Sequence, residues 1–174
     1  FYASNPAWSA AGTPSYHYIR AKEAGVKFIT VDPIYTASAQ ILDAYWIPVR
    51  TGTDTAFMLG VASEMLRLDK EEGNVVDWDF LDKYTVGFDA DHKPADLKED
   101  VNFLDYLNGV YDGEPKTAEW ASNICGVPVE KITYFAREIG KEHDVWMLHN
   151  FAAARCNGSE NVPQLFMTLS AMGG

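Results

Sequence analysis

Polar side chains that could bind a nucleotide follow short apolar runs of the sequence. Asn5 could offer an amide to a phosphate, and Ser9 a hydroxyl. Asp32 ends the second run, where a carboxylate suits ribose hydroxyls because it accepts two hydrogen bonds side by side. Asp54 could accept from both the N1–H and the N2–H₂ of guanine, an edge that adenine lacks. These residue types predict a purine-nucleotide site.

Each of these residues also has a purely structural explanation. Asn-Pro is a common turn, Asp32 could cap a helix or a turn, and Thr53 could cap the helix whose first turn contains Asp54. His149 follows the last apolar run, but one histidine without a paired carboxylate or nucleophile makes no catalytic set. Packing or hydrogen bonding is therefore the alternative for His149.

Several other kinds of site are disfavoured by spacing. The loop at residues 4–9 contains no glycine, whereas a nicotinamide dehydrogenase fold needs Gly-x-Gly-x-x-Gly there. Residues 89–94 open like a calcium loop, but Pro94 stands where the sixth position requires glycine. Cys125 and Cys156 form no Cys-x-x-Cys pair, which argues against a zinc ribbon or an iron–sulfur site.

Strand-like and helix-like patterns alternate along the chain, which predicts an α/β fold with parallel strands. We expect a Rossmann-like sheet of about four strands in the order 3-2-1-4, flanked by helices, with ligands beyond the carboxyl ends of the strands. The expected strands are residues 1–3, 27–31, 44–49 and 144–148. The expected helices are residues 14–24, 53–68, 78–84, 100–107, 117–124, 129–142 and 160–171.

The 174-residue chain has a formal charge of −11, and most of that charge belongs to one segment. Residues 69–119 hold 15 acidic and 5 basic side chains, a balance of −10. We interpret residues 69–128 as an acidic helical elaboration within a single domain that spans 1–174. The acidic charge argues against nucleic-acid partners. The chain begins with Phe1, not Met, and we expect it to be a piece of a longer protein.

Five ordered blocks resemble the dimethyl sulfoxide reductase family of molybdopterin oxidoreductases, in particular its anaerobic catalytic subunits. The similarity extends over nearly the whole chain, and the order and spacing of the blocks make it specific. The blocks are ASNPA at 3–7, FITVDPIYTASA at 28–39, WIPVRTGTDTA at 46–56, FLDKYTVGF at 80–88, and TAEWAS with ICGVP at 117–122 and 124–128.

The resemblance implies one α/β domain of a larger chain that helps to hold a molybdopterin guanine dinucleotide. Carried over by position, Asn5 and Ser9 would lie near the pyrophosphate, Asp32 near the guanosine, and Thr53 with Asp54 at the guanine edge. The phosphate and ribose roles could be exchanged. The full set of expected cofactor-binding residues is Asn5, Ser9, Asp32, Pro33, Thr36, Gly52, Thr53, Asp54, His149 and Asn150.

The same resemblance implies that the parent enzyme reduces an S- or N-oxide by oxygen-atom transfer at molybdenum. The family's metal-ligating residue, and the cysteines of any iron–sulfur cluster, lie upstream of the matched stretch, so we expect the isolated fragment to be inactive. Its expected partners are the other domains of the parent, with electron-transfer and membrane-anchor subunits, in a bacterial periplasmic or membrane-associated complex. The alternative is a standalone purine-nucleotide-binding α/β module.

Overall fold

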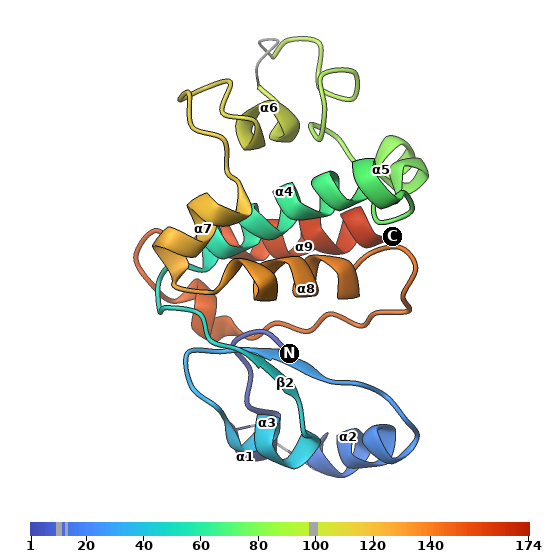
Figure 1. The fold of residues 1–174 in the computed structure, drawn as a ribbon, viewed down its shortest axis with the longest axis vertical. Coiled ribbons are helices and arrows are strands. Elements are labelled where there is room, and N and C mark those ends of the chain that lie inside the picture. The colour runs from blue at the N-terminus through green and yellow to red at the C-terminus, as the bar shows by residue number, and fades with distance from the viewer. Residues whose placement is uncertain (10–11, 13, 98–100) are drawn as a thin grey trace.

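A computed structural model describes residues 1–9, 12, 14–97 and 101–174. Figure 1 shows a layer of helices above β2, with the blue helices from the first part of the chain below it and a yellow-green helix at the opposite end of the molecule. The elements in chain order are α1 (Pro6–Ser9), α2 (Pro14–Glu23), β1 (Ile29–Val31), α3 (Ala37–Leu42), β2 (Tyr45–Ile47), α4 (Asp54–Glu72), α5 (Trp78–Tyr84), α6 (Phe103–Leu107), α7 (Ala118–Cys125), α8 (Val129–Glu138), the 3₁₀ helix η1 (Phe151–Ala154) and α9 (Val162–Gly173).

The sheet of the described chain is smaller than the sequence predicts. β1 and β2 pair in parallel, with Thr30 opposite Trp46. Tyr2 alone extends the ladder, through parallel bridges to Val31 on one side and His149 on the other. The expected four-strand Rossmann-like sheet is therefore not formed, and residues 144–148 form no strand. The physical reason is that residues 144–148 have no neighbouring strand to pair with beyond Tyr2.

Three short helices carry no signal that the sequence analysis used. α1, α3 and η1 each span four to six residues, too few for a helical period to show. α3 crosses from β1 to β2, and the Thr36 hydroxyl caps it by accepting from the amide of Ala39. Asp43 ends α3 in the left-handed conformation, with φ of 53°. Local capping, not periodicity, defines these elements.

The helices that the sequence predicted match their expected ranges closely. α5 has the expected bounds, and α7 begins one residue after Thr117, whose side chain caps it. α4 runs four residues beyond the expected end at Leu68, and α8 stops at Glu138 instead of residue 142. α6 begins at Phe103, after the cap at Asn102; the expected start at residue 100 lies outside the described residues.

Helix α4 is the centre of the hydrophobic core, with eleven buried residues along its nineteen. It packs against α7, α8 and α9, which surround it in Figure 1. Thr53 stands at its start, but the Thr53 hydroxyl donates to the carbonyl of Arg50 at 2.7 Å and makes no cap bond. None of the described helices is both long and apolar enough to span a membrane.

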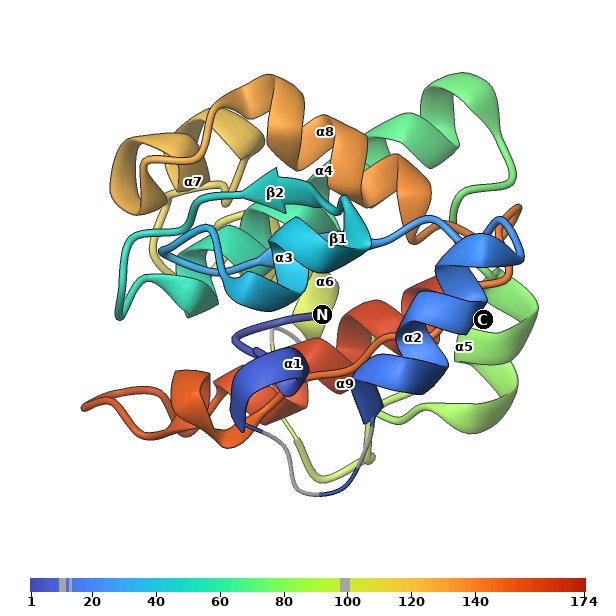
Figure 2. The same ribbon diagram turned by 90° about the horizontal axis from the view of Figure 1, so that it is seen from below.

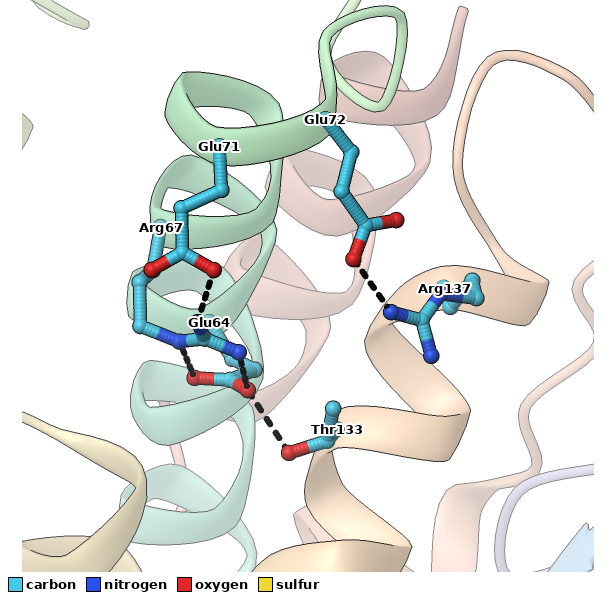
Figure 3. A network of polar contacts seen from close by, with 6 residues as sticks. All are labelled: Glu64, Arg67, Glu71, Glu72, Thr133 and Arg137. Carbon is cyan, nitrogen blue, oxygen red and sulfur yellow. Dashed lines mark hydrogen bonds and ion pairs between the residues drawn. The ribbon is translucent and has the colours of Figure 1, made fainter.

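A buried carboxylate joins α4 to α8 (Figure 3). Glu64 accepts bonds from Arg67 Nε at 2.9 Å and Nη2 at 2.7 Å, and from the hydroxyl of Thr133 on α8 at 2.6 Å. Hydrogen bonding by Arg67 is the main cause of a lowered pKa for Glu64, against the opposing effect of burial. Arg137 and Glu72 form a second, more exposed link between the two helices at 2.6 Å.

We predict that Gly60→Ala destabilises the fold, because a β-carbon at Gly60 would lie 2.3 Å from the β-carbon of Ala121 on α7. Overpacking of this kind costs about 1–3 kcal/mol and here outweighs the better helix propensity of alanine. Urea unfolding of both single variants and of the double variant Gly60→Ala/Ala121→Gly measures the effect. If Gly60→Ala lowers the free energy of unfolding equally in the unaltered chain and in the Ala121→Gly variant, the predicted contact is contradicted.

We also predict that Glu64→Gln lowers the free energy of unfolding by about 1–3 kcal/mol at neutral pH, because a buried hydrogen-bonded charge is lost. The folded-state pKa of Glu64 lies below its ordinary value of 4.5, so its contribution is complete above that pH and is lost as the pH falls through the folded-state pKa. The difference from the parent chain should therefore shrink in acid. Glu72→Gln, in the exposed pair, is the matched control and should cost less.

Candidate cofactor-binding site

The loops that contain the predicted site residues leave from one edge of the strand pair. Tyr2, Val31 and Ile47 are in register in the ladder, and the chain turns away after each of them. The amide of Asp32 donates to the carbonyl of Ile47 at 3.2 Å, and the indole of Trp46 donates to the carbonyl of Asp32 at 2.8 Å. We call this edge, at the carboxyl ends of β1 and β2, the carboxyl rim.

Asn5 holds α1 against α3. Its side-chain oxygen accepts bonds from the Ser38 amide at 3.1 Å and from the Ser38 hydroxyl at 2.7 Å. The Ser38 hydroxyl in turn accepts from the amide of Ala7 at 2.8 Å. Ser9 is exposed, and its hydroxyl donates to the carbonyl of Asn5 at 2.9 Å. The Asn5 oxygen and the Ser9 hydroxyl proton are therefore both used within the chain.

Asp32 is half-buried at the carboxyl rim, and one of its oxygens accepts from the Ile34 amide at 3.1 Å. Burial is the main cause of a raised pKa for Asp32, and the nearby charge of Asp54 raises it further. The two carboxylates thus lie close enough to repel each other. Pro33 is exposed beside Asp32, whereas Thr36 is buried and serves as the cap of α3.

Asp54 lies at the start of α4, and only 7% of it is exposed. The buried hydroxyl of Tyr2 donates to one of its oxygens at 2.9 Å. Asp54 stands in the first turn of this nineteen-residue helix. Gly52, at φ of 80°, makes the turn that leads into this helix and is exposed.

His149 and Asn150 have local structural partners. His149 packs edge-on against Phe166, with ring centroids 4.8 Å apart, and its Nδ1 lies 2.9 Å from the carbonyl oxygen of Asn150. The Asn150 side chain caps η1 by accepting from the amide of Phe151 at 2.7 Å. The structural alternative for His149 therefore accounts for every contact that the structure gives it.

The residues that hold the site residues in place were not among those predicted from the sequence. Tyr2 holds Asp54, Ser38 holds Asn5, and Trp46 bonds to the backbone of Asp32. Ser38 and Trp46 stand inside the blocks at 28–39 and 46–56 that resemble the family, so the sequence offered them as partners of those loops. Tyr2 could not have been identified as the partner of Asp54, because 52 positions of the chain separate the two residues.

The acidic segment contains one cluster, among the described residues, whose side chains could hold a metal ion: Asp82, Asp89 and His92. His92 Nδ1 lies 2.8 Å from Asp89 and 4.0 Å from Asp82. Hydrogen bonding to Asp89 raises the pKa of His92. An ion pair accounts for this cluster, and the start of the calcium-like run at residue 89 belongs to it.

Comparison with known proteins relates the chain to one kind of enzyme. It is 34% identical to a trimethylamine-N-oxide reductase of Haemophilus influenzae over 97% of the chain and 18% of the relative. It is 34% identical to the dimethyl sulfoxide reductase DmsA of Escherichia coli over 95% of the chain and 20% of the relative. No family model matches the chain.

The fold has a solved counterpart. Acetylene hydratase from Pelobacter acetylenicus superposes with a TM-score of 0.66 at 21% sequence identity, over 89% of this chain and 18% of that one. The similarity supports a shared fold for this part of the two proteins. The chain spans only about one fifth of the length of each reductase, and a similar share of the acetylene hydratase chain.

Fold and sequence together therefore define a mixed α/β segment of a molybdopterin oxidoreductase. Identity of 32–34% over nearly the whole chain places it in the dimethyl sulfoxide reductase family. The family resemblance of the five sequence blocks is confirmed.

We predict that the pKa of Asp32, measured by NMR titration of its carboxyl carbon, lies above 3.8. Asp54→Asn should lower this pKa by removing the neighbouring charge. It should not restore the ordinary value, because burial is the larger cause. Asp91→Asn, in the acidic segment, is the control and should leave the value unchanged. If the pKa of Asp32 is the same with and without Asp54→Asn, the two carboxylates do not share the carboxyl rim.

Proposed function

We propose that this chain is the part of a larger molybdenum reductase that helps to hold a molybdopterin guanine dinucleotide at the carboxyl rim. The observation that carries the proposal is the placement of two carboxylates: Asp32 directly follows β1, and Asp54, held by Tyr2 of the same ladder, begins the helix that follows β2. Carboxylates accept hydrogen bonds only, so they suit the N–H donors of guanine and the hydroxyls of ribose. Donors from a ligand would also relieve the repulsion between the two charges.

The hydrogen-bonding groups of the carboxyl rim fit such a nucleotide. Asp54 is the more enclosed carboxylate, and Tyr2 fixes its orientation, which suits a bidentate contact with a base edge. Asp32 is more accessible and suits a ribose. Thr53 and Gly52 border Asp54, and Asn5 with Ser9 lies on the next loop of the same rim, beside the expected pyrophosphate. Pro33, Thr36, His149 and Asn150 would shape the surrounding loops.

The cofactor would supply the molybdenum chemistry, and these residues would bind and orient its nucleotide end. The activity we propose for the whole protein is reduction of an S- or N-oxide by oxygen-atom transfer, since dimethyl sulfoxide and trimethylamine-N-oxide reductases are among its relatives. We further propose that the metal ligand and any iron–sulfur cluster belong to the other domains. Electron-transfer and membrane-anchor subunits, in a bacterial periplasmic or membrane-associated complex, complete the proposal.

Calorimetric titration with guanosine and adenosine diphosphates tests the nucleotide site. We expect the chain to prefer the guanine nucleotide by about tenfold, the effect of one bidentate base contact. Asp54→Asn should abolish the preference, whereas Asp32→Asn should weaken both nucleotides alike because both contain ribose. Circular dichroism checks that each variant folds, and Asp91→Asn is the control. Equal affinity of the unaltered chain for both nucleotides would overturn the assignment of Asp54.

A further inference from the structure

A pocket of about 310 Å³ lies where α4, α5, α6 and α9 meet. Each of these helices contributes lining residues, and the segment 85–88 that follows α5 completes the wall. Figure 1 shows α6 above α4, and Figure 2 shows α5 beside the last turn of α9, at the C-terminal end of the chain. None of the expected cofactor-binding residues lines this pocket, so it is separate from the carboxyl rim. We call it the four-helix pocket.

The inner part of the four-helix pocket is apolar. Four of the side chains that line it are each 8% exposed or less, and these are Leu59, Leu81, Phe88 and Leu165. Phe103 lines it as well, with its ring centroid 5.7 Å from that of Phe88. The Phe103 amide donates to the carbonyl of Gly87 at 2.9 Å, which ties the segment 85–88 to α6. The pocket therefore offers an apolar, ring-lined surface with a fixed wall.

The polar groups that line the four-helix pocket are uncharged. No Asp, Glu, Lys, Arg or His among the described residues lines it, although the chain has a formal charge of −11. An ion that entered the pocket would lose its hydration and meet no opposite charge there. The pocket therefore selects neutral molecules.

Four of these polar groups have no hydrogen-bond partner within the part of the chain that the structure describes. They are the hydroxyls of Thr55 and Tyr106 and the side-chain amides of Asn161 and Gln164. By contrast, the hydroxyls of Thr85 and Thr168 donate to the backbone carbonyls four positions earlier, at 2.7 Å and 2.9 Å. The first four groups are thus available to a ligand, whereas the protons of the last two are used within the chain.

Two of the available groups favour a carboxamide as their partner. Asn161 and Gln164 are three positions apart at the start of α9, so their amides are neighbours on one face of the helix. Each amide has a donor and an acceptor, and the carboxamide of a ligand offers the complementary pair. The hydroxyl of Thr55, in the first turn of α4, can donate to the same group.

We propose that the four-helix pocket binds a small neutral molecule that joins one aromatic ring to a carboxamide. The ring packs against Phe88 and Leu165, and the carboxamide bonds to Asn161, Gln164 and Thr55. A volume of about 310 Å³ lies at the lower end of the range for ligand pockets, which suits a single ring and not a dinucleotide. The proposal does not depend on the nucleotide assignment at the carboxyl rim.

Benzamide, benzoate and benzamidinium test the proposal, because the three probes have nearly the same shape and differ in charge. Titrations of the 174-residue chain are followed by NMR at the backbone amides of Phe88 and Leu165. About 0.5 M salt screens the general attraction of a cation to an acidic chain. We expect benzamide to bind about tenfold more tightly than either ion, because an unpaired charge is costly in an uncharged pocket.

A matched pair of variants tests the polar contacts. Thr55→Val should weaken the binding of benzamide by about three- to tenfold, since one hydrogen bond is lost. Thr168→Val makes the same change in the same pocket but should leave the affinity nearly unchanged, because the Thr168 hydroxyl already donates to the carbonyl of Gln164. Circular dichroism checks that both variants fold. Equal effects of the two substitutions would overturn the proposed contact between Thr55 and the carboxamide.

A second pair of variants changes the charge of the pocket. Gln164 is exposed, so Gln164→Glu leaves the core intact and tests the proposal even if Thr55→Val does not fold. It should raise the affinity for benzamidinium by about tenfold and lower the affinity for benzoate. Gln40→Glu, at an exposed position of α3, is the control and should leave the order of the three probes unchanged.

Three results would overturn the proposal. One is equal affinity of the chain for the three probes, and another is no binding of benzamide up to its solubility limit. The third is a set of shifts with benzamide that centres on Phe28 and Trp146, which line a separate apolar groove between β1 and residues 143–148.

Discussion

The rest of the structure depends on the close approach of other helices to α4. This helix is buried along most of its length, and α7, α8 and α9 all pack on it. Gly60 lets the backbone of α7 come within contact distance, since Thr117 and Ala118 lie next to it as well as Ala121. Because α4 also begins with Asp54, the packing that fixes the core fixes the position of one candidate ligand.

The elements that could be predicted from the sequence are those with enough length to show a period. α2, α4 and α9 each extend over ten or more residues, and their predicted bounds differ from the observed ones by four residues or fewer. α1 and α3 could not be found in this way, because side-chain caps and the bond network around Ser38 define them. The predicted four-strand sheet failed for a different reason, since strand pairing needs a neighbour that a run of apolar letters does not reveal.

The candidate site could be predicted as a set of loops but not as a set of contacts. The expectation that strands end at one edge is what grouped Asp32 with Asp54 in the prediction, and in the structure the charge of Asp54 raises the pKa of Asp32. What each oxygen does was beyond the sequence. Asn5 is bonded to Ser38, and Asp54 to Tyr2, through side chains more than 30 positions away. Long-range partners of this kind follow only from packing.

The two ends of the strand pair pose opposite physical problems. At the carboxyl rim, two acidic groups with a mutual repulsion need donors, which suits a polar ligand. At the amino end, the groove between β1 and residues 143–148 is lined mainly by apolar side chains. Tyr2 connects the two ends, because its backbone pairs with both Val31 and His149 while its hydroxyl holds Asp54. The backbone pairing of Tyr2 therefore also restrains the carboxylate that we assign to the nucleotide, through a single residue.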